Sequence, residues 1–199
     1  MNRRMWGAGA AAAVLALSAS LVETRAQTVQ GSDAALSDWG KVYEVLSHPR
    51  CVNCHVPADN RPRWSGPSYR LAEGEWAFHG MNISGGAERD GRNSIACSAC
   101  HAQTNSELPH GPPGAPHWAL APVEMTWLGK SSAALCAQIK DPAQTGGRDL
   151  AAIADHIGHD ALVLWGWDPG PGRAPAPFSA EETVSALIAW SDAGAPCPD

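Results

Sequence analysis

The stretches CVNCH, residues 51–55, and CSACH, residues 97–101, place one Cys-x-x-Cys-His pattern twice in a chain of 199 residues. Together they contain four of the six cysteines. A Cys-x-x-Cys pair serves thiol redox exchange, zinc binding or covalent haem attachment, and a His directly after the second Cys is typical of c-type haem attachment. With 8 His in the chain, a His at both positions has a chance probability of about 0.2%. The doubled motif therefore predicts two covalently attached c-type haems.

Each residue type in the motif has a chemical role in this prediction. The thiols add to the vinyl groups of the porphyrin, and the His becomes the proximal ligand of the iron. The six predicted cofactor-binding residues are Cys51, Cys54, His55, Cys97, Cys100 and His101. Two alternatives remain open. A Cys₄ zinc site would have 42 residues between its two Cys pairs, which is long for a zinc ribbon, and a thioredoxin-like motif would need a βαβ unit that the sequence does not indicate.

Three residues are candidates for the distal ligand on the far side of each iron: His79, Met125 and His156. His79 lies in a loop between the motifs that is long enough to fold back over the first haem, where Met81 competes with it. Met125 follows the second motif, and His156 lies at the edge of a helical apolar stripe, whereas His159 points nearly opposite to that stripe. An ordinary loop His and a core-filling Met are the alternatives for the first two.

The N-terminus has the three-part layout of a secretory signal peptide. Arg3 and Arg4 precede an apolar run, and small residues follow around Ala26, so we expect residues 1–26 to be removed and the mature protein to be periplasmic. An uncleaved anchor is the alternative, but after cleavage we expect no stable membrane insertion. The formal net charge is −6, and removal of residues 1–26, with three Arg and one Glu, lowers it to −8. This charge argues against binding to nucleic acid and favours partners with a basic docking patch.

The pattern along the chain predicts a mainly α fold with long loops. Apolar residues at steps of three and four indicate helices over about 32–47, 131–140, 149–164 and 179–194. In the last of these, Val184, Leu187 and Ile188 form the expected buried stripe. The segment from Val56 to Lys130 is rich in turns. Loops of that length inside a compact domain are usually functional or wrapped around a bound group. We expect one domain, residues 27–199, with lobes 32–95 and 96–199 as a further subdivision, wrapped around the two haems as a small cytochrome c-like dihaem domain.

Cys136 and Cys197 lie outside the two motifs. An even pair of cysteines in an oxidising compartment most simply forms a disulfide, which here would tie the C-terminus to the helix at 131–140. Two buried free thiols are the alternative.

The stretches HPRCVNCH, residues 48–55, and DALVLWGWDPGPGR, residues 160–173, extend these motifs. With them the chain resembles a small group of bacterial dihaem cytochrome c-like proteins, described as subunits or electron-transfer partners of isoquinoline 1-oxidoreductase-type molybdenum hydroxylases. The likeness runs from about His48 to the C-terminal GAPCP. It implies periplasmic electron transfer, with any hydroxylation carried out by a partner.

The leading hypothesis is therefore an electron carrier that relays electrons from a dehydrogenase or molybdenum hydroxylase to the respiratory chain, through an acceptor cytochrome or oxidase. The sequence indicates no catalytic residues in such a carrier. The alternative is a peroxidase-like dihaem enzyme in which one iron lacks a distal ligand, flanked by an acid or base such as Glu124 or His117. Arg173 is a candidate partner for a haem propionate.

Overall fold

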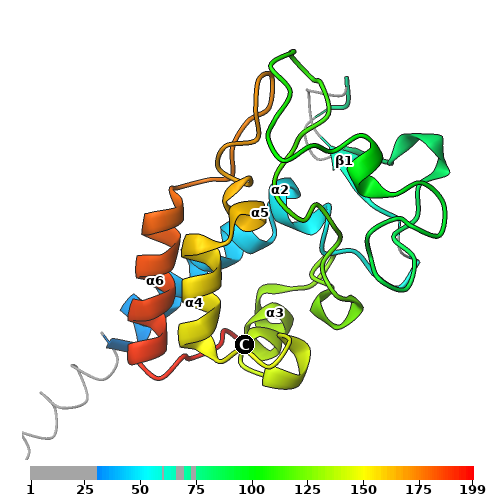
Figure 1. Ribbon diagram of the computed structural model, residues 1–199. Helices are drawn as coiled ribbons and strands as arrows, with labels where there is room; N and C mark the ends of the chain where they lie inside the picture. The colour runs from blue at the N-terminus through cyan, green and yellow to red at the C-terminus, as the bar shows by residue number, and fades with distance from the viewer. Residues whose placement is uncertain (1–30, 60, 66–69, 73–74) are drawn as a thin grey trace, which may run out of the picture.

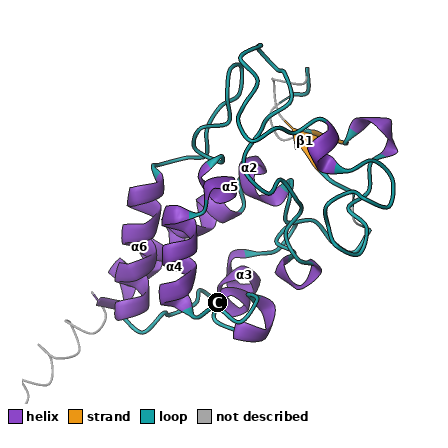
Figure 2. Ribbon diagram, in the orientation of Figure 1, coloured by secondary structure: helices purple, strands orange, loops and turns teal. Residues whose placement is uncertain are grey.

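The computed structural model describes residues 31–59, 61–65, 70–72 and 75–199. The predicted signal peptide, residues 1–26, lies outside the described residues. The described chain is mostly helical, with long loops and one small two-stranded sheet, which confirms the predicted mainly α class (Figure 2).

Three of the four expected helices form close to their predicted bounds. Residues 31–46 are helical, and α3 spans Ser132–Ile139 and α6 spans Ala180–Asp192. The Ser131 hydroxyl accepts from the amide of Ala134, and Ser179 and Glu182 form a complete capping box. Both caps satisfy amides that a helix N-terminus leaves without a partner.

The expected helix at 149–164 is in fact two helices, so this prediction was wrong in its extent. Helix α4 spans Leu150–His159, and α5 spans Ala161–Leu164. Asp160 between them has extended backbone angles, φ −75° and ψ 122°, and its side chain accepts from the amides of Leu162 and Val163. Because this side chain caps a new helix, α4 ends one residue before it.

The hydrophobic core joins the two ends of the chain. Helices α4 and α6 lie side by side, the helix 31–46 runs behind them, and α3 lies near the C-terminus (Figure 1). Trp39 and Trp190 are buried, with ring centroids 4.9 Å apart, and Leu135 and Leu187 are fully buried in the same cluster. This cluster draws on both of the expected lobes, 32–95 and 96–199, so the helical core is continuous across that boundary.

The packing of α6 agrees with its predicted stripe in part. Leu187 is fully buried and Val184 packs against the core, but the side chain of Ile188 is 47% exposed. The prediction for Ile188 was wrong because the face of α6 toward the core is rotated to bury Thr183, Ala186 and Trp190 instead.

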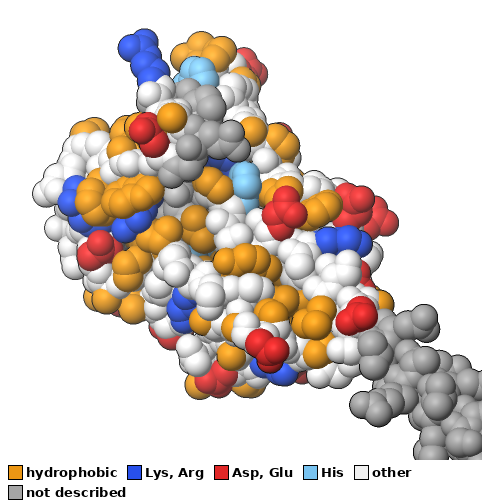
Figure 3. All heavy atoms as spheres, turned by 180° about the vertical axis from the view of Figure 1, so that it is seen from behind, with side chains coloured by type: hydrophobic (Ala, Val, Ile, Leu, Met, Phe, Trp, Pro, Cys, Tyr) orange, Lys and Arg blue, Asp and Glu red, His pale blue; other side chains and the backbone are white. Residues whose placement is uncertain are grey.

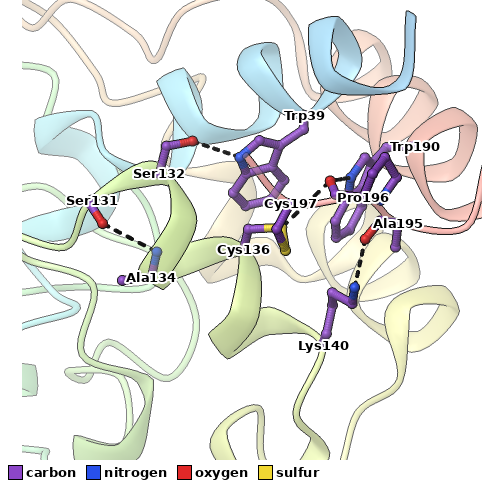
Figure 4. Close-up of a disulfide and its surroundings, with 10 residues drawn as sticks. All are labelled: Trp39, Ser131, Ser132, Ala134, Cys136, Lys140, Trp190, Ala195, Pro196 and Cys197. Atoms are coloured by element: carbon purple, nitrogen blue, oxygen red, sulfur yellow. Dashed lines mark hydrogen bonds between the residues drawn. A yellow bond between two sulfur atoms is a disulfide. The ribbon is translucent and has the colours of Figure 1, made fainter. Parts of the chain in front are cut away.

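The predicted disulfide between Cys136 and Cys197 is present, with Cα atoms 5.6 Å apart (Figure 4). It fixes the C-terminal segment against α3. Around it, the indole nitrogen of Trp190 donates to the carbonyl of Pro196 at 2.7 Å, and Lys140 donates to the carbonyl of Ala195 at 2.6 Å.

The described residues of the segment 56–130 are mostly loop, as expected, and lie to one side of the helical core (Figure 1). Within it, strand β1, Arg63–Ser65, pairs antiparallel with β2, Trp76–Phe78, with Trp64 opposite Ala77. This small sheet was not predicted. Short helices punctuate the rest of the chain: α2, Pro49–Val52; η2, Gly80–Asn82; η3, Cys97–Ala99; η4, Val123–Met125; and η5, Pro142–Gln144. Across the described residues, every helix is too short or too polar to span a bilayer.

Candidate cofactor sites

The two Cys-x-x-Cys-His units fold into the same backbone turn. In the first, the amides of Cys54 and His55 both donate to the carbonyl of Cys51, at 3.1 Å each. In the second, the amides of Cys100 and His101 donate to the carbonyl of Cys97, at 3.2 and 2.9 Å. One turn of helix-like backbone puts the second Cys and the His beyond it close in space to the first Cys. Each unit therefore presents two thiols and one imidazole as a local group.

His55 is held from two directions. Its Nδ1 lies 2.7 Å from the carbonyl oxygen of Met125, and its ring stacks on Trp127 with centroids 3.4 Å apart and planes 6° apart. Because a carbonyl oxygen only accepts, Nδ1 carries the proton and Nε2 keeps its lone pair. Burial, with smaller contributions from the charges of His156 and Arg89, lowers the pKa of His55 to about 4. The ring is thus neutral at physiological pH, as a metal-ligating His must be.

His101 repeats this arrangement in the second unit. Its Nδ1 lies 2.8 Å from the carbonyl oxygen of Pro113, and its ring stacks on Trp118 with centroids 4.5 Å apart and planes 5° apart. Burial lowers the pKa of His101 as well. Gly114 makes this contact possible, because a Cβ there would collide with the carbonyl oxygens of Ala102 and Thr104. In both units a downstream carbonyl fixes the ring orientation, the arrangement that commonly orients metal-bound imidazoles.

Each unit opens into its own cavity, lined mainly by apolar side chains. We call these the His55 cavity, about 280 Å³, and the His101 cavity, about 310 Å³. Both volumes are near the lower end for small-molecule sites, which run from about 300 to 1,000 Å³. Cys51, Cys54 and His55 line the first, and Cys97, Cys100 and His101 line the second, together with Cys54. The structure therefore gives each motif a separate, preformed space.

His79 lies opposite His101, not over the first unit as the sequence analysis expected. The two ring centroids are 6.1 Å apart, and both residues line the His101 cavity. The Nδ1 of His79 lies 2.9 Å from the carbonyl oxygen of Gly80, which leaves its Nε2 with the lone pair. The expectation failed because His79 directly follows β2 and is held beside β1: its amide donates to the carbonyl of Pro62 at 3.0 Å, and its ring stacks on Trp64.

The His55 cavity contains the two other candidate ligands, His156 and Met125. Met125 is buried and lies at the first unit although it follows the second motif in the sequence, since its own carbonyl accepts from His55. His156 comes from α4, its side chain is 29% exposed, and its Nδ1 lies 3.5 Å from Oδ2 of Asp160. His159, as expected, is solvated, with its side chain 79% exposed.

The four motif cysteines are free thiols. Burial raises the pKa of Cys51 to about 12 and that of Cys54 to about 11, and burial also raises the pKa of Cys97. Redox-active Cys-x-x-Cys thiols have lowered pKa values, so the environment of Cys51 and Cys54 does not suit thiol exchange. In the described part of the chain, no three His, Cys, Asp or Glu side chains converge to hold a bare metal ion, so the Cys₄ zinc alternative gains no geometric support.

The His101 cavity has cationic side chains at its walls that would suit an anionic group. Arg63 and Arg173 line it, and Arg173 is buried. The Nε of Arg63 is buried without a hydrogen-bond partner among the described residues, while its guanidinium lies 3.6 Å from the ring centroid of Trp76. A porphyrin carrying carboxylates would supply that partner. Two thiols, a neutral imidazole, apolar walls and arginines together fit a haem.

The sequence analysis missed the tryptophans that stack on the histidines. Trp127 stacks on His55, Trp118 stacks on His101, and Trp64 stacks on His79, with centroids 5.2 Å apart in the last pair. No spacing signal links these residues to the motifs. Glu124 and His117, the acid or base named for an enzymatic site, are both exposed and line neither cavity.

Comparison with protein-family models, with curated proteins and with solved structures found no match to this chain.

Proposed function

We propose that this chain is a dihaem c-type cytochrome that transfers electrons between partner proteins. The observation that carries the proposal is the close pair His79 and His101, with ring centroids 6.1 Å apart, in the lining of the cavity that Cys97 and Cys100 also line. His79 and His101 would be able to hold one iron between them, because two metal–imidazole bonds of about 2 Å each, plus the two half-rings, would span about 6 Å. A haem bound there supplies reversible one-electron chemistry at its iron.

The chain's own residues would bind the group, orient its ligands and limit the access of water. The carbonyls of Met125 and Pro113 fix the His55 and His101 rings, and Trp127 and Trp118 cover one face of each ring. In the His55 cavity we assign His156 as the facing ligand, because it reaches the cavity from a separate helix while the backbone of Met125 contacts His55. If these histidines held both irons, neither iron would have an open position, which would favour electron transfer over peroxidase-like turnover.

Location and partners follow from the same proposal. The Cys136–Cys197 disulfide is consistent with an oxidising compartment such as the periplasm. Near the His101 cavity, Cys100 is exposed, and Met81 and Ile95 in its lining are 73% and 37% exposed. A redox partner would thus approach the second unit more closely than the first. Charged side chains of both signs are scattered among hydrophobic ones on the face in Figure 3, a composition compatible with weak docking.

The resemblance to cytochromes described with molybdenum hydroxylases suggests a hydroxylase or dehydrogenase as donor and a cytochrome or oxidase as acceptor. Neither the donor nor the acceptor would be nucleic acid or a membrane surface, given the net charge of the chain.

The test is maturation of the full chain in a bacterial host that attaches c-type haem, followed by a pyridine haemochrome assay and intact mass measurement. We expect two covalent haems per chain, low-spin spectra and no reaction with carbon monoxide. A double variant, Cys97→Ser with Cys100→Ser, should retain one haem. A wild-type protein without covalent haem would refute the proposal, and a wild-type high-spin fraction that binds carbon monoxide would favour the enzyme instead.

A further inference from the structure

The two cavities share a wall. Six described residues line both of them: Arg50, Cys54, Trp118, Ala119, Leu120 and Trp165. Trp118 and Trp165 meet edge to face, with centroids 4.9 Å apart and planes 84° apart. Groups bound in the two cavities would therefore be separated by single side chains.

Among the six described residues of that shared wall, Arg50 is the one with a charged side chain. It lies on α2 directly before Cys51 and is 9% exposed. Its Nε donates to the carbonyl of Ala174 at 2.9 Å, and its guanidinium carbon lies 5.7 Å from the ring centroid of Trp165. These contacts hold a permanent positive charge between the cavities, because an arginine side chain stays protonated in proteins.

Each of the other charged residues described in the cavity walls lines one cavity and not both. Arg148 and Asp160 line the His55 cavity, and Arg63 and Arg173 line the His101 cavity. The charge of Arg50 already acts on the first unit, where it opposes the burial that raises the pKa of Cys51 and Cys54. A buried charge is screened less than an exposed one, so its influence reaches groups on both sides.

We propose that the positive charge of Arg50 acts on both haem sites and raises the reduction potential of each. This inference rests on the proposed function. Reduction adds one electron to each site, and a nearby positive charge favours the state with the additional negative charge. Loss of the charge should therefore lower both potentials together, whereas loss of a charge that faces one cavity should lower one potential.

The experiment is a spectroelectrochemical titration of the holo protein that resolves two midpoint potentials. We expect Arg50→Gln to lower both midpoints and Arg50→Lys to preserve them. The matched controls are Arg148→Gln, which should lower one midpoint, and Arg63→Gln, which should lower the other. Unchanged visible spectra would show that the axial ligands stay in place.

A shift of only one midpoint in Arg50→Gln, or of neither, would overturn the inference while the proposed function stands. Arg50→Met is the second neutral variant if Arg50→Gln does not accumulate. If neither neutral variant acquires haem while Arg50→Lys acquires two, Arg50 acts in haem attachment and the inference is wrong. A wild-type chain without haem would overturn the proposed function, and this inference with it.

Discussion

Replacement of His79 by Ala should open the second site to an external ligand. The ring centroids of His79 and His101 are 6.1 Å apart, and the Nδ1 of each ring lies within hydrogen-bond distance of a carbonyl oxygen. Removing the His79 ring leaves the far side of the His101 cavity without its imidazole. The expected change is from no carbon monoxide bound to one per chain, which is half of the haem. Added imidazole should occupy the vacated space and suppress the binding.

The assay is titration of the reduced protein with carbon monoxide, followed in the visible spectrum and quantified against total haem. His156→Ala should also yield one carbon monoxide per chain, from the His55 cavity, and the double variant should yield two. His159→Ala is the matched control, because His159 lies on the same helix with its side chain 79% exposed. It should bind none. A His79→Ala protein with two low-spin haems and no carbon monoxide binding would refute the assignment of His79.

Three further predictions concern stability, each measured as the free energy of unfolding of the holo protein in urea. The Cys136–Cys197 disulfide spans a sequence separation of 61, so replacing both cysteines by Ser should cost about 4 kcal/mol by loop-closure entropy, and a loss below about 1 kcal/mol would contradict that account. Leu187→Ala should cost about 2–5 kcal/mol, because Leu187 is fully buried, whereas Ile188→Ala on the same helix should cost much less. Ser179→Ala removes the capping box of α6 and should cost about 1 kcal/mol; no change would mean that the cap is unimportant.

The predictable part of the fold is the part that local chemistry determines. Ser131 and Ser179 lie where a side-chain oxygen must satisfy helix amides, and both helices begin directly after them. The cysteine count outside the motifs is even, and the two remaining cysteines are paired. Each of these features depends on a few neighbouring residues or on one count, so the sequence contains enough information to specify it.

The unpredicted part depends on the path of the chain through space. In the sequence, Asp160 has the pattern of an ordinary polar position within a helix. Its side chain can cap a new helix instead of continuing the first, and hydrophobic periodicity does not distinguish these two outcomes. His79 lies between the two motifs in the sequence, and the loop that contains it has no local signal to indicate which motif it approaches. The pairing of β1 with β2 sets that direction, and three-residue strands are too short to produce a pattern.

The segment 165–173 follows α5 and joins the helical core to the loops. Trp165 donates from its indole nitrogen to Asn105 at 3.0 Å, and the Asn105 amide donates to the carbonyl of Asp168 at 2.8 Å. The amide of His110 donates to the carbonyl of Pro171 at 3.2 Å. These contacts of Trp165, Asp168 and Pro171 hold the loop at 105–111 against the end of α5. Since Trp165 also lies in the wall shared by both cavities, the same stretch sets how close the two sites are. A requirement for closely spaced sites would explain why this loop-like sequence is so rich in bulky and rigid residues.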